Sequence, residues 1–153
     1  MKKIILSLLV TSALFTACKK DDDNGGGTTT NQWKIGPNTY TGTTGATVQG
    51  NMVSNGSSNG TTASSFVVSF NTLPTTSGTY KITSSPLADD EVSILAGTGS
   101  TTSGTFYASM DNSSTATVTV TDGKISVTVP SVWAKNMADV TDSLQISGNL
   151  TQK

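Results

Sequence analysis

The chain has 153 residues, of which 12% are charged, and its formal net charge is −1. All nine of its cations are lysines, and it contains no histidine. Nucleic-acid binding is disfavoured, because neutralising phosphates requires a basic face. The lack of histidine also removes the most common general base and metal ligand.

Residues 1–17 have the pattern of a signal peptide. Two lysines follow Met1, and Ile4 to Phe15 form an apolar run of 12 residues. A helix that spans a bilayer needs about 20 residues, so this run is too short to be a membrane anchor. We therefore expect residues 1–17 to direct export and then to be removed.

The single cysteine follows this run directly, in Leu14-Phe15-Thr16-Ala17-Cys18. Small residues before the cysteine suit a peptidase groove, and the chain has no second cysteine for a disulfide. The segment resembles the lipobox of bacterial lipoproteins, with Phe15 where leucine is usual. This resemblance implies that Cys18 is acylated and becomes the mature N-terminus. The alternative is an ordinary secretory signal with a chance cysteine.

Residues 18–30 are expected to form a tether. Lys19, Lys20, Asp21, Asp22 and Asp23 follow the cysteine, and a glycine- and threonine-rich stretch completes the tether. The charged stretch resembles the export signal that sends lipoproteins of Bacteroidota to the cell surface. The resemblance implies a lipoprotein of the outer membrane that faces the surface, with the periplasmic side as the alternative. Two lysines beside the acyl chains also favour anionic headgroups, by about 1 kcal/mol each.

Residues 31–153 are expected to form one β domain, because apolar residues there recur with a period of two. The clearest element is a hairpin in which Asp122-Gly123 supplies the positive φ angles of a type I′ turn. Pro130 is predicted to end the second strand of this hairpin, because proline cannot donate to a ladder. The apolar or small residues expected to share a face within the other strands are Phe66, Val68, Phe70, Tyr80, Ile82, Val92, Ile94, Phe106, Ala108, Met110, Leu144, Ile146, Gly148 and Leu150.

Turn-forming clusters separate these strands at short intervals, for example at residues 55–60 and 97–100. Many short strands of this kind favour a single antiparallel β-sandwich of the Greek-key, immunoglobulin-like or jelly-roll type. A small up-and-down barrel is the alternative. Residues 64–150 also resemble small β-sandwich lipoproteins of Bacteroidota that have no assigned function. This resemblance implies the same fold and the same compartment.

One acidic cluster, Asp89-Asp90-Glu91, is the domain's candidate for catalysis or metal binding. Paired carboxylates can hydrolyse glycosides, but consecutive residues at a strand entry point to alternating faces, so a solvated loop is favoured. Calcium takes six to eight oxygen ligands, and this cluster, or Asp139 with Asp142, could supply some of them. No loop has the spacing of an EF-hand. We therefore predict no enzyme, no metal ligand and no cofactor.

Aromatic side chains are the remaining candidates for ligand binding. Trp33 and Trp133, with Tyr40 and Tyr107, could form a surface on which sugars stack. Trp133 is the stronger candidate because it lies in a polar connection, although a tryptophan can also cap the open end of a sandwich. Separately, Asp142-Ser143-Leu144 resembles the O-glycosylation motif of Bacteroidota, which implies that Ser143 is an acceptor.

These features together predict a non-catalytic, lipid-anchored module that binds a partner or serves a structural role on the outer membrane. The alternative is a glycan-binding accessory lipoprotein of an uptake system, which the tryptophans suggest. A hydrolase built on the acidic cluster and a fibre subunit assembled by strand exchange are less favoured hypotheses. The lipid is expected to contact the membrane, no nucleic acid is expected to bind, and the glycan or protein partner is unidentified.

Overall fold

The computed structural model describes residues 31–100, 103–110 and 113–153, and this part of the chain is all-β. The signal peptide, Cys18, the charged residues 19–23 and the rest of the tether lie outside the described residues. The strands are β1 Gln32–Ile35, β2 Asn38–Thr41, β3 Thr47–Gln49, β4 Met52–Ser58, β5 Thr62–Phe70, β6 Gly78–Ile82, β7 Glu91–Ser100, β8 Gly104–Ser109, β9 Thr115–Thr121, β10 Lys124–Asn136 and β11 Ser143–Thr151. The predicted fold class is confirmed.

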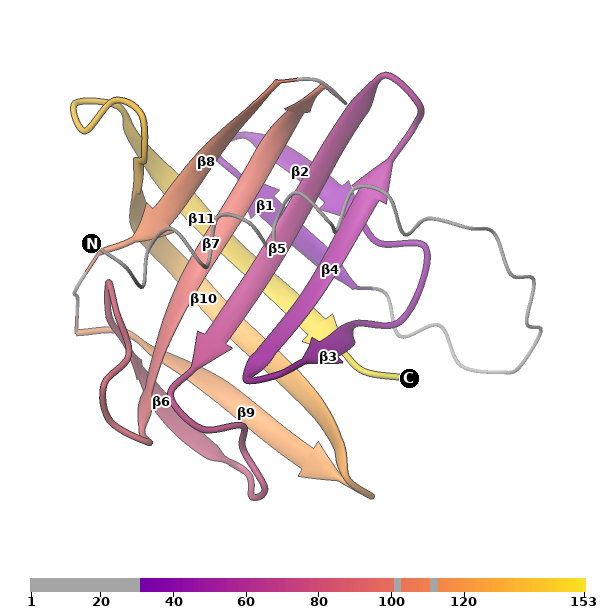
Figure 1. Cartoon of the computed structure of the whole chain (residues 1–153), viewed down its shortest axis with the longest axis vertical. Helices are drawn as coiled ribbons and strands as arrows, with labels where there is room; N and C mark the ends of the chain where they lie inside the picture. The colour runs from indigo at the N-terminus through magenta and orange to yellow at the C-terminus, as the bar shows by residue number, and fades with distance from the viewer. Residues whose placement is uncertain (1–30, 101–102, 111–112) are drawn as a thin grey trace.

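The strands belong to one sheet that curls into two layers. Neighbouring strands follow the order β2-β1-β11-β10-β9-β6-β7-β5-β4-β3, and β8 pairs with both β10 and β7. In Figure 1, β4, β5, β7 and β8 form the nearer layer, with β1, β2, β10 and β11 behind it and β6 and β9 at the lower end. Among the described strands, pairing is antiparallel except between β6 and β7, which are parallel. The result is a mixed sheet with a sandwich-like arrangement, in which β8 joins the two layers along one side.

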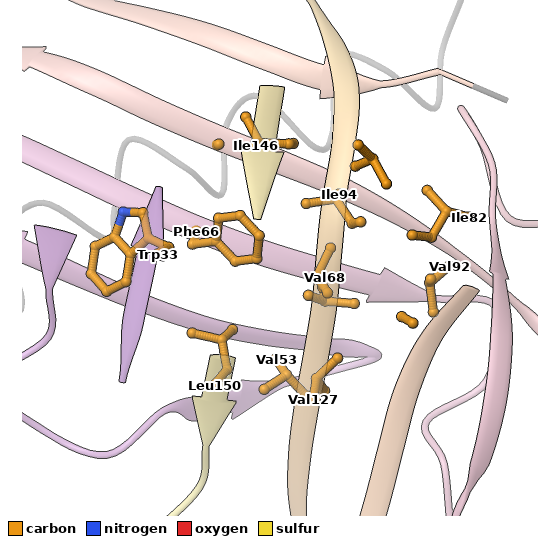
Figure 2. Packing of buried hydrophobic residues seen from close by; sticks show 14 of the residues in the cluster. Trp33, Val53, Phe66, Val68, Ile82, Val92, Ile94, Val127, Ile146 and Leu150 are labelled. Atoms are coloured by element: carbon orange, nitrogen blue, oxygen red, sulfur yellow. The ribbon is translucent and has the colours of Figure 1, made fainter. Parts of the chain in front are cut away.

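The core lies between the two layers, because one face of each strand points inward. Figure 2 shows Phe66 of β5 beside Trp33 of β1, so side chains from opposite layers meet there. Tyr80 and Leu144 are partly buried and pack against this core. The other residues expected to face inward on β5, β6, β7 and β11 are confirmed as buried, namely Phe66, Val68, Phe70, Ile82, Val92, Ile94, Ile146, Gly148 and Leu150.

The predicted hairpin is confirmed, but its second strand is longer than predicted. Asp122 has a φ of 53° and Gly123 a φ of 74°, as a type I′ turn requires. Beyond it, β10 continues past Pro130, with a shift of register between Val129 and Val132. A bulge leaves extra residues out of the ladder, so proline is tolerated there without donating a hydrogen bond. The prediction that Pro130 ends the strand is wrong.

The face of β8 that points into the core is opposite to the face that its sequence suggests. Tyr107 and Ser109 are buried, whereas Phe106, Ala108 and Met110 are only partly buried. Both inward hydroxyls have hydrogen-bond partners. The Phe106 ring lies outside, over β7, at a point where a glycine leaves room for it. The expectation that Phe106, Ala108 and Met110 form the inward face of this strand is therefore corrected.

Ser109 is expected to stabilise the junction of β6, β7 and β8. Its buried hydroxyl accepts a hydrogen bond from the Ile94 amide and donates one to the Thr83 carbonyl, each at 2.9 Å. Ser109→Ala would leave both groups unsatisfied in the core, so the free energy of unfolding should fall by about 1–3 kcal/mol. Urea unfolding of a soluble form that starts at Lys19 measures this, with the exposed Ser131→Ala as control. Equal stability of the two variants would contradict the expectation.

Candidate binding face

The outward surface of β1, β10 and β11, which we call the Trp133 face, is the candidate binding site. Val132 and Ala134 are buried in the core, so the alternation of the strand turns Trp133 and Lys135 outward. The Trp133 side chain is 53% exposed, and no other aromatic residue in the described ranges is exposed to this extent. Trp133 therefore lies on a strand rather than in the predicted connection, and its ring is accessible to a ligand.

Polar side chains surround Trp133 on this face. Cross-strand partners lie on the same side of a sheet, and Trp133 pairs with Gln145 of β11. On the other side of β11, Lys34 of β1 pairs with Ser147. The exposed residues of the Trp133 face are Gln32, Lys34, Lys124, Thr128, Pro130, Ser131, Trp133, Lys135, Ser143, Gln145 and Asn149. The face thus presents hydroxyl, amide and ammonium groups around one indole.

The charge on this face has a single sign. Strands β1, β10 and β11 contain Lys34, Lys124 and Lys135, and their sequences contain no aspartate or glutamate. The chain as a whole has a slight excess of acids, ten against nine lysines. The positive charge of this face is therefore a local property that the overall composition hides.

Aspartates border the face at both ends: Asp122 lies in the turn before β10, and Asp139 and Asp142 lie in the connection between β10 and β11. Asp142 accepts hydrogen bonds from the Tyr107 hydroxyl at 3.0 Å and from the Asn136 amide at 2.9 Å. Burial, followed by this contact with Asp142, raises the pKa of Tyr107, which keeps its hydroxyl a donor. Hydrogen bonds from the Thr141 hydroxyl and amide lower the pKa of Asp139. Both acids thus help to hold the connection in place.

Trp33 does not contribute to this surface. Its side chain is 1% exposed, and its ring stacks on Tyr40 with ring centroids 6.3 Å apart. The Tyr40 hydroxyl is hydrogen-bonded to Thr98 of the opposite layer at 2.9 Å. Trp33 therefore offers no ring to a ligand, which corrects the expectation that it belongs to a sugar-stacking surface. Buried Tyr107 is likewise unavailable for stacking.

The side chains of Asp89 and Glu91 in the acidic cluster hydrogen-bond to nearby loop residues and so help to order the loop before β7. Asp89 accepts hydrogen bonds from the Thr72 and Asn71 side chains, and these two contacts lower its pKa. Glu91 accepts from the amides of Leu87 and Ala88. Within the described residues, no group of three or more aspartate, glutamate, cysteine or histidine residues could hold a metal ion. These contacts support the interpretation as a solvated loop.

Ser143, the candidate glycosylation site, lies on the Trp133 face. It is exposed at the first position of β11 and pairs with Lys135. The aspartate before it is already held by two hydrogen bonds. A glycan on Ser143 would therefore share this surface with any ligand of Trp133.

Trp133 was the only member of this face that the sequence indicated as a binding residue. Lys34 lies on β1, and Gln145 and Asn149 lie on β11, so their proximity to Trp133 depends on the pairing of β1 and β10 with β11. One signal was available in the sequence. The alternation of β10 resumes after Pro130 with Val132 and Ala134, which implies that Trp133 continues a strand.

No protein-family model, curated protein or solved structure matches the chain. Among the described residues, no helix has the length and apolar character needed to cross a bilayer.

Proposed function

We propose that the chain is a non-catalytic, lipid-anchored binding module of the outer membrane, and that the Trp133 face makes its contact with a ligand. The observation that carries the proposal is the half-exposed indole of Trp133 on a strand whose other exposed residues, apart from Pro130, are polar. Tryptophan is enriched at interfaces because it joins a large apolar ring to a hydrogen-bonding group. Acylation of Cys18 and export to the cell surface are parts of this proposal.

The start of the domain suits attachment to a tether. Asn31 is 1% exposed, and its side chain donates hydrogen bonds to the carbonyls of Thr44 and Thr151 at 3.0 and 3.3 Å. The Thr151 amide donates back to the Asn31 side chain at 2.5 Å. The first residue of the domain is thus fastened to β11, and a tether of residues 18–30 would give a reach of about 20 Å from the bilayer.

A glycan-binding accessory lipoprotein is the form of this proposal that the Trp133 face favours. A fibre subunit receives less support, because the edge strands β2 and β3 have only four and three residues. Short edges offer few free backbone groups for strand exchange. A hydrolase receives less support because Asp89 and Glu91 are engaged in loop hydrogen bonds.

Cys18→Ala tests the anchor in the full-length chain. We expect the unchanged chain to sediment with membranes of a bacterium that processes lipoproteins, and the variant to become soluble, because acyl chains supply about 0.8 kcal/mol per buried methylene. Phe15→Leu is the matched control, since it brings the segment closer to the usual lipobox and should keep the chain in membranes. Mass spectrometry should find a lipid on Cys18, and protease added to intact cells should digest a surface-facing domain.

Retention of Cys18→Ala in membranes would contradict the anchor, as would a free thiol at this residue or a processed chain that starts beyond it. Protection from external protease would contradict only the surface orientation and would favour the periplasmic side.

A further inference from the structure

We infer that the Trp133 face binds an acidic polysaccharide, that is, a sugar chain that carries carboxylate or sulfate groups. The inference rests on the proposed function, because it names the ligand class of the same face. It depends on the spacing of the lysines around Trp133, on the sign of the charge, and on the chemistry of the residues between the lysines.

The two central lysines lie on opposite sides of the indole. Along β11, Ser143 pairs with Lys135, Gln145 pairs with Trp133, and Ser147 pairs with Lys34. Strands in a sheet are about 4.8 Å apart, and side chains on one face of a strand are about 6.8 Å apart. Lys135 and Lys34 are therefore two strand spacings apart across the sheet and four residues apart along it, which places their Cα atoms about 17 Å from each other. This span exceeds a monosaccharide and suits a chain of several sugars.

The charge of the Trp133 face favours an acidic polysaccharide over a neutral one. Lys34 and Lys135 face solvent without an acid on the three strands of the face, whereas Lys124, at the far end of β10, follows the exposed Asp122 by two residues. Concentrating like charges on one surface repels them from one another, and an anionic ligand relieves this repulsion. Ammonium groups form charge-assisted hydrogen bonds with carboxylate and sulfate oxygens. A neutral polysaccharide would gain none of these contacts.

The groups between the lysines match the uncharged part of a sugar. The indole of Trp133 offers a flat apolar surface for the C–H face of a pyranose ring. Gln145, directly opposite Trp133, has both a donor and an acceptor for a hydroxyl. Asn149 and Gln32, which pair with each other beyond Lys34, extend the same chemistry along β11 and β1. A polysaccharide that lies across the three strands could therefore stack on the indole, form hydrogen bonds through its hydroxyl groups and place its anionic groups near the lysines.

A bilayer with anionic headgroups is the main competing occupant, because tryptophan and lysine also favour membrane interfaces. The composition of the face argues against it. Trp133 is the one large apolar side chain exposed on these three strands, and the lysines beside it are interspersed with glutamine, serine, threonine and asparagine, while the exposed Met137 and Val140 lie beyond the strands, in the connection between β10 and β11. Hydroxyl and amide groups gain nothing from insertion among acyl chains.

The test measures binding of the processed, acylated chain in detergent micelles to polygalacturonate and to the same polymer with its carboxyl groups methyl-esterified. We expect binding to polygalacturonate at low salt, a loss of at least about tenfold in affinity at about 0.3 M NaCl, and at least about tenfold weaker binding of the esterified polymer. Trp133→Ala should also lose about tenfold, and Trp133→Phe should lose less, because it keeps a ring. Lys34→Gln combined with Lys135→Gln should weaken binding and flatten its dependence on salt.

Two control variants match these changes in chemistry. Lys81→Gln removes an exposed lysine from β6, outside the three strands, and Leu87→Ala removes an exposed apolar side chain from the loop before β7. Neither should change binding. Unchanged binding in Trp133→Ala, or equal affinity for the two polymers, would overturn the inference. So would binding of the soluble form that starts at Lys19, which carries no lipid, to vesicles with anionic lipids in place of either polymer, if that binding is lost in Trp133→Ala. If the affinities for the two polymers are equal but still depend on Trp133, only the assignment of an acidic ligand would be overturned, and the proposed binding module would remain supported.

Discussion

Trp33→Ala is expected to lower the free energy of unfolding by about 3–5 kcal/mol, the usual cost of removing a large aromatic side chain from a core. The side chain is 1% exposed and stacks on Tyr40. Its Cβ lies 3.1 Å from the position that a Cβ on Gly148 would occupy, so it is in close contact with β11. Truncation would therefore leave a cavity where β1, β2 and β11 meet.

Trp33→Phe should cost much less, about 1 kcal/mol. The indole N–H of Trp33 is buried and has no hydrogen-bond partner among the described residues. Phenylalanine removes this unsatisfied donor and keeps most of the apolar volume, so the two effects partly offset each other. Urea unfolding of the soluble form that starts at Lys19 measures both variants.

Trp133→Ala is the matched control, because it truncates the same residue type on an exposed surface. It should change the free energy of unfolding by less than about 0.5 kcal/mol. Fluorescence separates the two residues further, since Trp33 should emit as a buried indole and Trp133 as a solvated one. A Trp33→Ala variant as stable as Trp133→Ala would contradict the burial of Trp33.

The difference between the two tryptophans illustrates what the sequence could establish. Local alternation predicted most of the strands, because a period of two is visible within a few residues. It predicted the Asp122-Gly123 turn for the same reason, since two adjacent residues set its geometry. Alternation alone could not show which face of a strand meets the core. For β8 the hydrophobicity pattern favoured the wrong face, because the inward hydroxyls of Tyr107 and Ser109 have distant partners.

Glycine and serine content also gave incorrect boundaries. Residues 55–58 and 97–100 were predicted as turns, but they lie within β4 and β7. Gly97 pairs with both neighbouring strands, and a glycine is required there because the Phe106 ring occupies the space that a side chain would fill. Such a requirement comes from a neighbouring strand and leaves no trace in the local sequence. The same limit applies to the Trp133 face, whose lysines and amides come together through pairing at long range.

Gly148→Val is expected to destabilise the fold by about 3 kcal/mol, at the upper end of the usual cost of overpacking a core. A Cβ at Gly148 would lie 2.9 Å from one atom of the Phe66 ring and 3.1 Å from the Cβ of Trp33. Phe66 is fully buried and belongs to the opposite layer, so its ring has little room to move. At Gly148, therefore, the backbone of one layer contacts an aromatic ring of the other.

A double-mutant cycle with Phe66→Ala tests whether this contact explains the glycine. Phe66→Ala alone should cost about 3–5 kcal/mol by opening a cavity. In that background, valine at residue 148 partly refills the cavity, so the double variant should be more stable than the sum of the single effects by about 1–3 kcal/mol. Gly78→Ala is the control, since its added Cβ would meet only an ordinary contact at 3.7 Å. Strict additivity would mean that Gly148 is not needed to accommodate Phe66.

The same cycle connects the core to the candidate site. A shift of one residue in a strand exchanges its inward and outward side chains. Because Gly148 faces Phe66, Ser147 and Asn149 on either side of it must face outward, in line with Gln145. Gly148→Val should therefore weaken binding at the Trp133 face to the extent that it displaces β11, and the Phe66→Ala background should restore part of that loss. Restored stability without restored binding would show that the outer face depends on more than the register of β11.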